Sequence, residues 1–191
     1  MSLRIVAVSG SLKKINRTQQ AVGILRHYLT EKKHEVKVID LASFPLPFVD
    51  ERPATDYPPE VQDLKSMIAA ADGIILATPE YHNSLTGALK NAIDHLSERE
   101  FKGKPVALLS TAGGAVGVDS LNDMRLIMRS LHAVVIPRQV SIVHASQQFD
   151  EEGKLKDKSL ETRLFEMADE LVRFATLFKS DSQTEVVRWT R

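Results

Sequence analysis

Short apolar runs alternate along this chain with longer segments in which apolar residues recur every three or four positions. Three of the short runs are almost continuously apolar and predict buried strands: Leu3–Ser9, Gly73–Thr78 and Pro105–Thr111. Two further runs are interrupted. Val36–Asp40 alternates apolar and charged residues, and Val134–Val143 carries Pro137, which has no N–H to donate to a neighbouring strand. We therefore expect these two strands at the edges of a sheet.

The longer segments predict helices, because their apolar residues gather on one face of a 3.6-residue turn. They span about Thr18–Lys32, Pro59–Ala71, Thr86–Ser97, Val118–Ser130 and Ser159–Lys179. Residues 42–59 hold five of the eight prolines and predict an irregular loop. Gln147–Lys158 is polar and acidic, which is typical of a surface segment.

Strands that alternate with helices predict an α/β fold, a doubly wound five-stranded parallel sheet with helices on both faces. Continuously apolar strands belong at its centre, since helices cover both of their faces there. With the second and fifth strands at the edges, the order is 2-1-3-4-5, which is flavodoxin-like, and such sheets bind ligands beyond the carboxyl ends of the strands. The 191 residues suit one domain, which we place at residues 1–179, followed by a C-terminal tail at 180–191.

Composition excludes several kinds of chemistry. The chain has no cysteine, so it has no disulfide, no thiolate metal site and no cysteine nucleophile. Its 25 basic and 25 acidic residues balance, which argues against binding to nucleic acid or to an anionic membrane surface. The six histidines are scattered without metal-ligand spacing, so we expect no metal. With no targeting signal and no apolar run near the roughly 18 residues of a membrane helix, we expect a cytoplasmic protein.

The segment between the first strand and the first helix combines hydrogen-bond donors with three cations in five residues. Free backbone N–H groups and the positive end of a helix favour an anion there, so the segment predicts a phosphate site. The alternative is a solvated basic loop with a Thr cap. Neither a Walker A motif nor a three-glycine dinucleotide fingerprint occurs, which favours a phosphate monoester. The donors are Ser11, Asn16 and Thr18, and the cations are Lys13, Lys14 and Arg17.

Two more loops follow the third and fourth strands and meet the first at one edge of the predicted sheet. Residues 79–87 read Pro-Glu-Tyr-His-Asn-Ser-Leu-Thr-Gly, and residues 110–114 read Ser-Thr-Ala-Gly-Gly. Taken alone, residues 79–87 predict a turn with a helix cap, and residues 110–114 predict a flexible turn. Because all three loops share one edge, we expect them to form one binding site in which the adjacent glycines let the backbone approach a flat ligand.

The second loop and the helix after it carry a resemblance to the NADPH-dependent FMN reductase family. Its members typically read Pro-Glu-Tyr-Asn-x-Ser-x-Pro-Gly-x-Leu-Lys-Asn-Ala-Ile-Asp. This chain matches at Pro79-Glu80-Tyr81, Ser84, Gly87 and Leu89–Asp94, and it departs with His82 for Asn and Thr86 for Pro. In the first loop Lys13 stands where Arg is usual, and Asn16 replaces a usual Ser.

The resemblance implies an FMN site without a catalytic acid or base, because the flavin supplies the chemistry. It implies that the first loop holds the FMN phosphate, that the second runs along the isoalloxazine mainly through its backbone with Tyr81 beside the ring, and that the third approaches the ring. The implied cofactor-binding residues are Ser11, Lys13, Asn16, Arg17 and Thr18 in the first loop, Pro79, Glu80, Tyr81 and His82 in the second, and Ser110, Gly113 and Gly114 in the third.

The resemblance also implies an enzyme in which NADPH or NADH reduces FMN and a small acceptor then takes two electrons. Quinones, free flavin, azo compounds, nitroaromatic compounds, chromate and ferric chelates are all open as acceptors. It further implies a homodimer or homotetramer, with the helices at Thr86–Ser97 and Val118–Ser130 as candidate contacts. One competing hypothesis is a flavodoxin-like domain that binds no flavin, and the other is a flavodoxin-type electron carrier without NAD(P)H activity. Such carriers are usually strongly acidic and enclose the flavin between aromatic side chains, whereas this chain is neutral.

Overall fold

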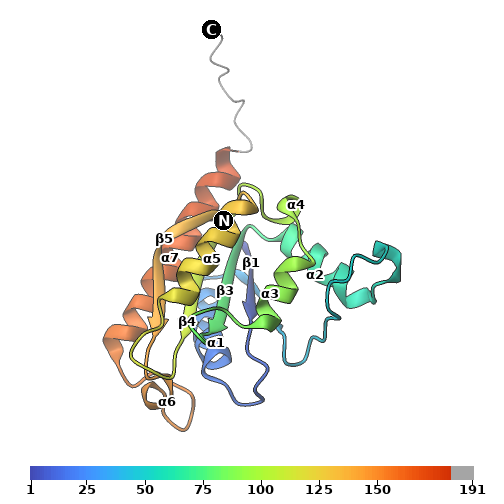
Figure 1. The fold of residues 1–191 in the computed structure, drawn as a ribbon. Coiled ribbons are helices and arrows are strands. Elements are labelled where there is room, and N and C mark those ends of the chain that lie inside the picture. The colour runs from blue at the N-terminus through green and yellow to red at the C-terminus, as the bar shows by residue number, and fades with distance from the viewer. Residues whose placement is uncertain (182–191) are drawn as a thin grey trace.

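A five-stranded parallel sheet forms the centre of the computed structural model, which describes residues 1–181 (Figure 1). The strands lie in the order β2-β1-β3-β4-β5, and every neighbouring pair is parallel. This arrangement confirms the predicted flavodoxin-like order. The strands are β1 (Arg4–Ser9), β2 (Glu35–Asp40), β3 (Gly73–Pro79), β4 (Pro105–Thr111) and β5 (Val134–Ile142).

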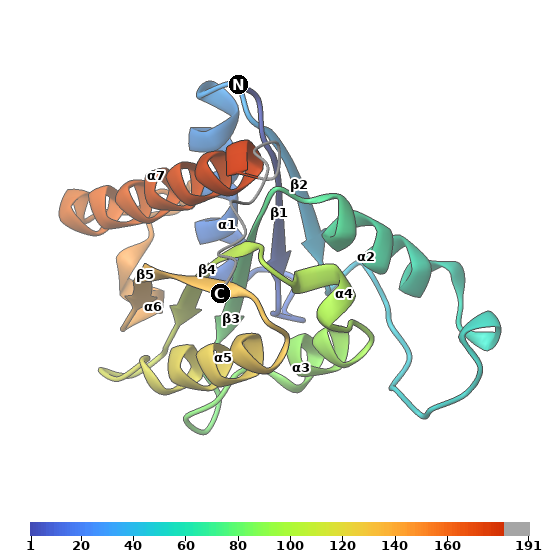
Figure 2. The same cartoon turned by 90° about the horizontal axis from the view of Figure 1, so that it is seen from above.

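Helices cover both faces of the sheet, as Figure 2 shows from above. On one face lie α1 (Arg17–Glu31) and α7 (Lys158–Asp181), and on the other lie α2 (Pro59–Ala70), α3 (Gly87–Asp94), α4 (Glu98–Phe101) and α5 (Asp119–Ser130). Side chains of β1 show how each strand serves two cores, since successive residues point to opposite faces. Ile5 and Ala7 pack with the first pair of helices, whereas Val6 and Val8 pack with the second group.

Three short elements were not expected, and one predicted helix ends early. The segment expected as a single helix at Thr86–Ser97 stops at Asp94, and α4 begins only four residues later, at Glu98. Ser97 causes the break because its hydroxyl accepts from the Arg99 N–H, while Glu100 bonds back to Ser97 in a capping box. The other short elements are a 3-10 turn at Ala54–Asp56 and α6 (Ala145–Gln148).

The two interrupted strands form the sheet edges, as expected. In β2 the exposed Glu35 and Lys37 alternate with the half-buried Val36 and Val38, and Ile39 is buried. In β5 the pairing with β4 shifts between Val106 and Leu108, opposite the stretch that contains Pro137. The missing N–H of proline explains why this strand breaks register there. At its other end the chain remains helical through Asp181, beyond the expected boundary at residue 179, and the rest of the predicted tail lies outside the described residues.

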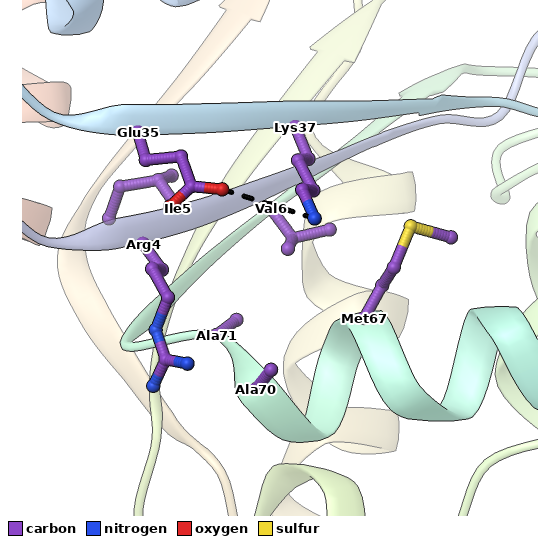
Figure 3. A pocket seen from close by; sticks show the side chains of 8 residues that line it. All are labelled: Arg4, Ile5, Val6, Glu35, Lys37, Met67, Ala70 and Ala71. Atoms are coloured by element: carbon purple, nitrogen blue, oxygen red, sulfur yellow. Dashed lines mark ion pairs between the residues drawn. The ribbon is translucent and has the colours of Figure 1, made fainter.

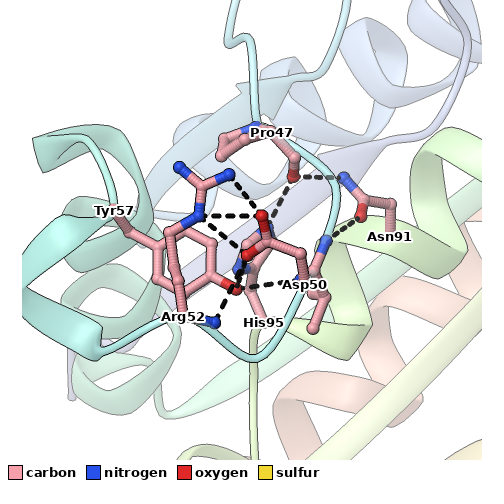
Figure 4. Close-up of polar contacts among 7 residues, drawn as sticks. Pro47, Asp50, Arg52, Tyr57, Asn91 and His95 are labelled. Atoms are coloured by element: carbon pink, nitrogen blue, oxygen red, sulfur yellow. Dashed lines mark hydrogen bonds and ion pairs between the residues drawn. The ribbon is translucent and has the colours of Figure 1, made fainter.

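The proline-rich loop after β2 is tied onto α3, as Figure 4 shows. The Pro47 carbonyl accepts from Asn91 Nδ2 at 2.9 Å and lies 2.8 Å from His95 Nε2. Farther along the loop, Asp50 accepts from Arg52 and from the Tyr57 hydroxyl. The guanidinium of Arg52 holds the pKa of the Asp50 carboxyl well below its usual range. The loop is therefore irregular but has defined anchors.

A small pocket between β1, β2 and α2 has too little room for a cofactor (Figure 3). Its volume is about 40 Å³, enough for only a few water molecules. Arg4, which opens β1, places it at the amino ends of the strands, away from the predicted loops.

None of the helices in the described part of the chain combines the length and apolar character needed to cross a bilayer.

Candidate functional site

The loop between β1 and α1 is held close to β3 and is closed by an asparagine. The Gly10 N–H donates to the Ala77 carbonyl at 2.8 Å, and a Cβ on Gly10 would lie 2.9 Å from Leu89 Cβ. Only glycine fits this approach. Asn16 is the N-cap of α1, accepting from the Gln19 N–H at 2.6 Å, and its Nδ2 donates to the Lys13 carbonyl at 2.7 Å. One side chain therefore fixes both the start of the helix and the curve of the loop.

Hydroxyl groups with unused hydrogens gather at this loop from α1, from the end of β4 and from the loop itself. Thr18 Oγ1 and Thr111 Oγ1 lie 2.6 Å apart, and both residues are buried. One hydroxyl donates within the pair, so the hydrogen of the other remains for a ligand oxygen. Ser11 is 1% exposed, and its Oγ accepts from the Lys13 N–H, which leaves its own hydrogen to donate. These groups suit an anion with several oxygen atoms.

The loop after β3 makes a tight turn beside this donor cluster. The Glu80 N–H donates to the Thr111 carbonyl at 2.9 Å, so the loop starts as an extension of the sheet. Tyr81 and Ser84 then exchange both backbone hydrogen bonds around His82 and Asn83, whose φ values are +52° and +63°. This is a two-residue hairpin. The turn leaves the Tyr81 side chain 46% exposed.

The loop after β4 is anchored at its far end. The fully buried Ser110 donates its hydroxyl to the Gly117 carbonyl. A Cβ on Gly117 would lie 2.2 Å from Ser141 Oγ and 2.9 Å from Ala112 Cβ, so this position also requires glycine. By contrast, a Cβ on Gly113 would have no other atom within 4 Å. The loop is packed at Gly117 and open at Gly113.

These loops enclose a cleft of about 320 Å³ at the carboxyl ends of the strands. That volume lies at the lower end of the range for small-molecule sites. Most of the predicted site residues line it; Ser110, His82 and Gly114 do not. Its lining residues are Ser11, Lys13, Ile15, Asn16, Arg17, Thr18, Pro79, Glu80, Tyr81, Thr111, Ala112, Gly113, Ala145 and Ser146.

Several lining residues were missed from the sequence. Thr111 and Ala112 lie inside the third predicted loop, for which the expected binding residues are Ser110, Gly113 and Gly114. Ala145 and Ser146 belong to α6, which follows β5. The rule that ligands bind beyond the carboxyl ends of parallel strands applies to the fifth strand as well, and it would have found them.

Arg17 points along α1 and across to α6. Its Nη1 donates to Gln20 Oε1 at 2.7 Å, and its guanidinium carbon lies 5.5 Å from the centre of the Phe149 ring. Lys13 lines the same cleft with its side chain exposed. The two cations make this end of the cleft positive.

Among the described residues, no group of three or more His, Asp or Glu side chains could hold a metal ion.

The chain matches the family model for NADPH-dependent FMN reductase over residues 3–147. It belongs to this family. An NADPH azoreductase from Bacillus sp. (strain OY1-2) is 39% identical over 139 residues, which cover 72% of this chain and 75% of that protein. The NADPH-dependent FMN reductase ArsH of Rhizobium meliloti (strain 1021) is 32% identical over 184 residues, covering 94% of this chain and 75% of the relative.

Solved structures show the same fold. The flavoenzyme FerB of Paracoccus denitrificans superimposes with a TM-score of 0.77 at 21% identity, over 93% of this chain and 98% of that one. Family membership decides among the hypotheses. The protein is an NAD(P)H-dependent flavin oxidoreductase with FMN as cofactor and NADPH as co-substrate, and it is not a flavodoxin-type carrier.

The residues of the cleft fit FMN. A phosphate needs several donors and positive charge, and this end supplies unused hydroxyl hydrogens, the start of α1 and two cations. A flat ring needs open backbone, and Gly113 has free space where a side chain would stand. The donor end and the glycine end belong to one cleft, as a ligand with a phosphate at one end and a ring at the other requires.

Proposed function

We propose that the protein uses this cleft to transfer two electrons from NADPH to a small planar acceptor, with azo compounds as the first class to test. The observation that carries the proposal is the open mouth of the cleft. Ile15 lines it with 83% of its surface exposed, and Tyr81 is 46% exposed. Exposed apolar groups at the mouth favour a flat, apolar acceptor. Two curated relatives at 38–39% identity are named azoreductases, which supports this choice.

We also propose a role for each wall of the cleft. Ser11, Lys13 and Thr18 would hold the FMN phosphate, with Asn16 shaping the loop and Arg17 adding charge. When bound, FMN supplies hydride acceptance and two-electron donation. The ring-side residues would orient the flavin through backbone groups and leave one face of the ring accessible. These residues are Pro79, Glu80, Tyr81 and Gly113. His82, Ser110 and Gly114 lie outside the lining of the cleft and would act by shaping the two loops.

Proton balance does not require an acidic side chain in the cleft. Reduction of an azo bond to a hydrazo group takes two electrons and two protons. The hydride from NADPH brings both electrons and one proton, and solvent at the open mouth supplies the second. This agrees with the expectation that the chain provides no catalytic acid or base.

A steady-state panel tests the proposal. An azo dye, a quinone, free flavin and chromate are each assayed with NADPH and with NADH. Double-reciprocal plots should be parallel, because one open face cannot hold both substrates at once. In anaerobic stopped flow NADPH alone should bleach the flavin absorbance, and the azo dye should restore it. An azo dye that leaves the reduced protein unchanged, while another acceptor reoxidises it, would overturn the choice of substrate.

We propose further that residues 1–179 act as one FMN-binding domain in a homodimer or homotetramer. Both apolar clusters pack on the same sheet, which supports one domain. The exposed Leu126 and Val118, on and next to α5, support that helix as a contact between copies, together with α3. Light scattering on the purified protein measures the oligomeric state, and a monomer at micromolar concentration would contradict it.

A further inference from the structure

The turn that carries Tyr81 is joined to α5 by two side-chain contacts, one on each limb. On the incoming limb, Glu80 Oε2 accepts from both the N–H and the hydroxyl of Ser120, at 2.9 Å each. On the outgoing limb, the Ser84 hydroxyl donates to Asp123 Oδ2 at 2.6 Å. Ser120 and Asp123 are three residues apart in a helix and therefore lie on one face. That face meets the turn from both sides.

The Glu80 contact also caps the N-terminus of α5. The first N–H groups of a helix have no partner within it and need an acceptor from elsewhere. The N-cap of α5 is Val118, whose side chain cannot accept a hydrogen bond, and the structure shows no side-chain cap there. The carboxylate of Glu80 provides an acceptor from another loop, and its negative charge suits the positive end of the helix. Ser120 is fully buried, so its N–H would otherwise have no access to water.

The turn needs outside support because of its backbone conformation. His82 and Asn83 both have positive φ, a conformation that residues other than glycine adopt only at a cost in backbone strain. Such a conformation persists when the surrounding structure over-determines it. The only bonds within the hairpin itself are the two between the backbones of Tyr81 and Ser84. The contacts to α5 supply the rest.

We propose that Glu80 is a positioning residue: its carboxylate, together with the Ser84–Asp123 contact, fixes the Tyr81 turn against α5 and thereby sets the wall beside the flavin ring. This rests on the proposed placement of the ring at that wall. The family resemblance implies that the loop containing Glu80 contacts the flavin ring through its backbone. The Glu80 carboxylate instead contacts Ser120 of α5, so the side chain has a role of its own. The same two contacts link the ring-side wall to the proposed subunit-contact helix.

Amide hydrogen exchange on the FMN-free protein tests the mechanical part. In Glu80→Ala, the amides of Ser120, Tyr81 and Ser84 should exchange at least about tenfold faster than in the wild type, because the cap and one anchor are lost. Glu80→Gln keeps an acceptor oxygen and should restore most of the protection. Asp119→Asn is the matched control, since it removes a charge from the same helix end without touching the turn. Unchanged exchange at Tyr81 and Ser84 in Glu80→Ala overturns the proposal.

Ligand affinity tests the part that concerns the flavin. Glu80→Ala should weaken FMN and riboflavin by the same factor, about tenfold, because the ring wall is common to both ligands. Ser84→Ala should act in the same direction and keeps the test open if Glu80→Ala does not fold. Affinity for both ligands that is unchanged in the two variants overturns the proposal. Failure of the wild-type protein to bind FMN at all would instead refute the placement of the ring, which separates the two claims.

Discussion

Asn16 offers the sharpest separation between folding and cofactor binding in this protein. Its Oδ1 accepts from the Gln19 N–H at 2.6 Å as the N-cap of α1, and its Nδ2 donates to the Lys13 carbonyl at 2.7 Å. Replacement by alanine removes both bonds. The cap contributes about 1 kcal/mol and the loop bond about another 1 kcal/mol to the free energy of unfolding. A loss of about 2 kcal/mol should lower the Tm of the FMN-free protein by roughly 4–8 °C.

Asn16→Asp changes the charge while keeping the cap. Aspartate accepts the Gln19 N–H as well as asparagine does, and its charge suits the helix N-terminus. The FMN-free protein should therefore lose only the loop bond, about 1 kcal/mol. The same carboxylate repels a phosphate at this loop and removes a donor. FMN affinity should fall by about 10- to 150-fold, which corresponds to about 1.5–3 kcal/mol.

Two titrations and one melting curve per variant separate the effect on FMN affinity from the effect on stability. Riboflavin has the flavin ring without the phosphate, so Asn16→Asp should bind it with nearly wild-type affinity. Calorimetry with FMN and with riboflavin gives the two dissociation constants, and thermal melting without ligand gives the stability. An aspartate variant that binds FMN as tightly as the wild type would refute the reasoning, because it would show that the phosphate lies elsewhere.

Four further outcomes are expected. Lys13→Ala should weaken FMN by about 10- to 150-fold and riboflavin hardly at all, since a charge-assisted contact is worth about 1.5–3 kcal/mol; calorimetry showing equal losses would contradict a phosphate contact. Gly117→Ala places a methyl group 2.2 Å from Ser141 Oγ and should lower the free energy of unfolding by roughly 1–3 kcal/mol in denaturant titrations. Gly113→Ala, with open space around it, should leave stability unchanged. His34 is partly buried and accepts a backbone N–H, and burial lowers the pKa of its imidazole below 6.5. The unfolded chain then binds this proton more readily than the folded protein, so stability should fall as the pH drops below about 6.5. His34→Gln should flatten that part of the Tm profile.

The sequence was informative about the fold because its strands differ in pattern. Continuous apolar runs indicated the centre of the sheet, and the alternation in Val36–Asp40 and the proline in Val134–Val143 indicated its edges. The division of the Thr86–Ser97 segment was not foreseen. The apolar periodicity continues through it, and the capping box at Ser97, which ends one helix and begins another, competes with that periodicity.

The sequence was less informative about the site, because it cannot show where a side chain points. The three loops meet as expected, and most of the predicted residues line one cleft. Ser110 has the right residue type in the right loop, yet its hydroxyl faces Gly117. Thr111, its neighbour, instead pairs with Thr18 across the cleft. Adjacent residues at the end of a strand point to opposite faces, so an uncertainty of one residue reverses the assignment.

The free edge at β5 has a consequence for the behaviour of the protein at high concentration. An exposed strand edge is a template on which another chain can add a strand and begin to aggregate. Here Pro137 has no N–H to offer, and the Arg138 N–H is already taken by Glu170 of α7 at 2.8 Å. A further ion pair joins Arg138 to Glu166 at 2.7 Å. The interruption in the strand therefore protects this edge against strand addition, and copies of the chain that meet there would have to associate through side chains.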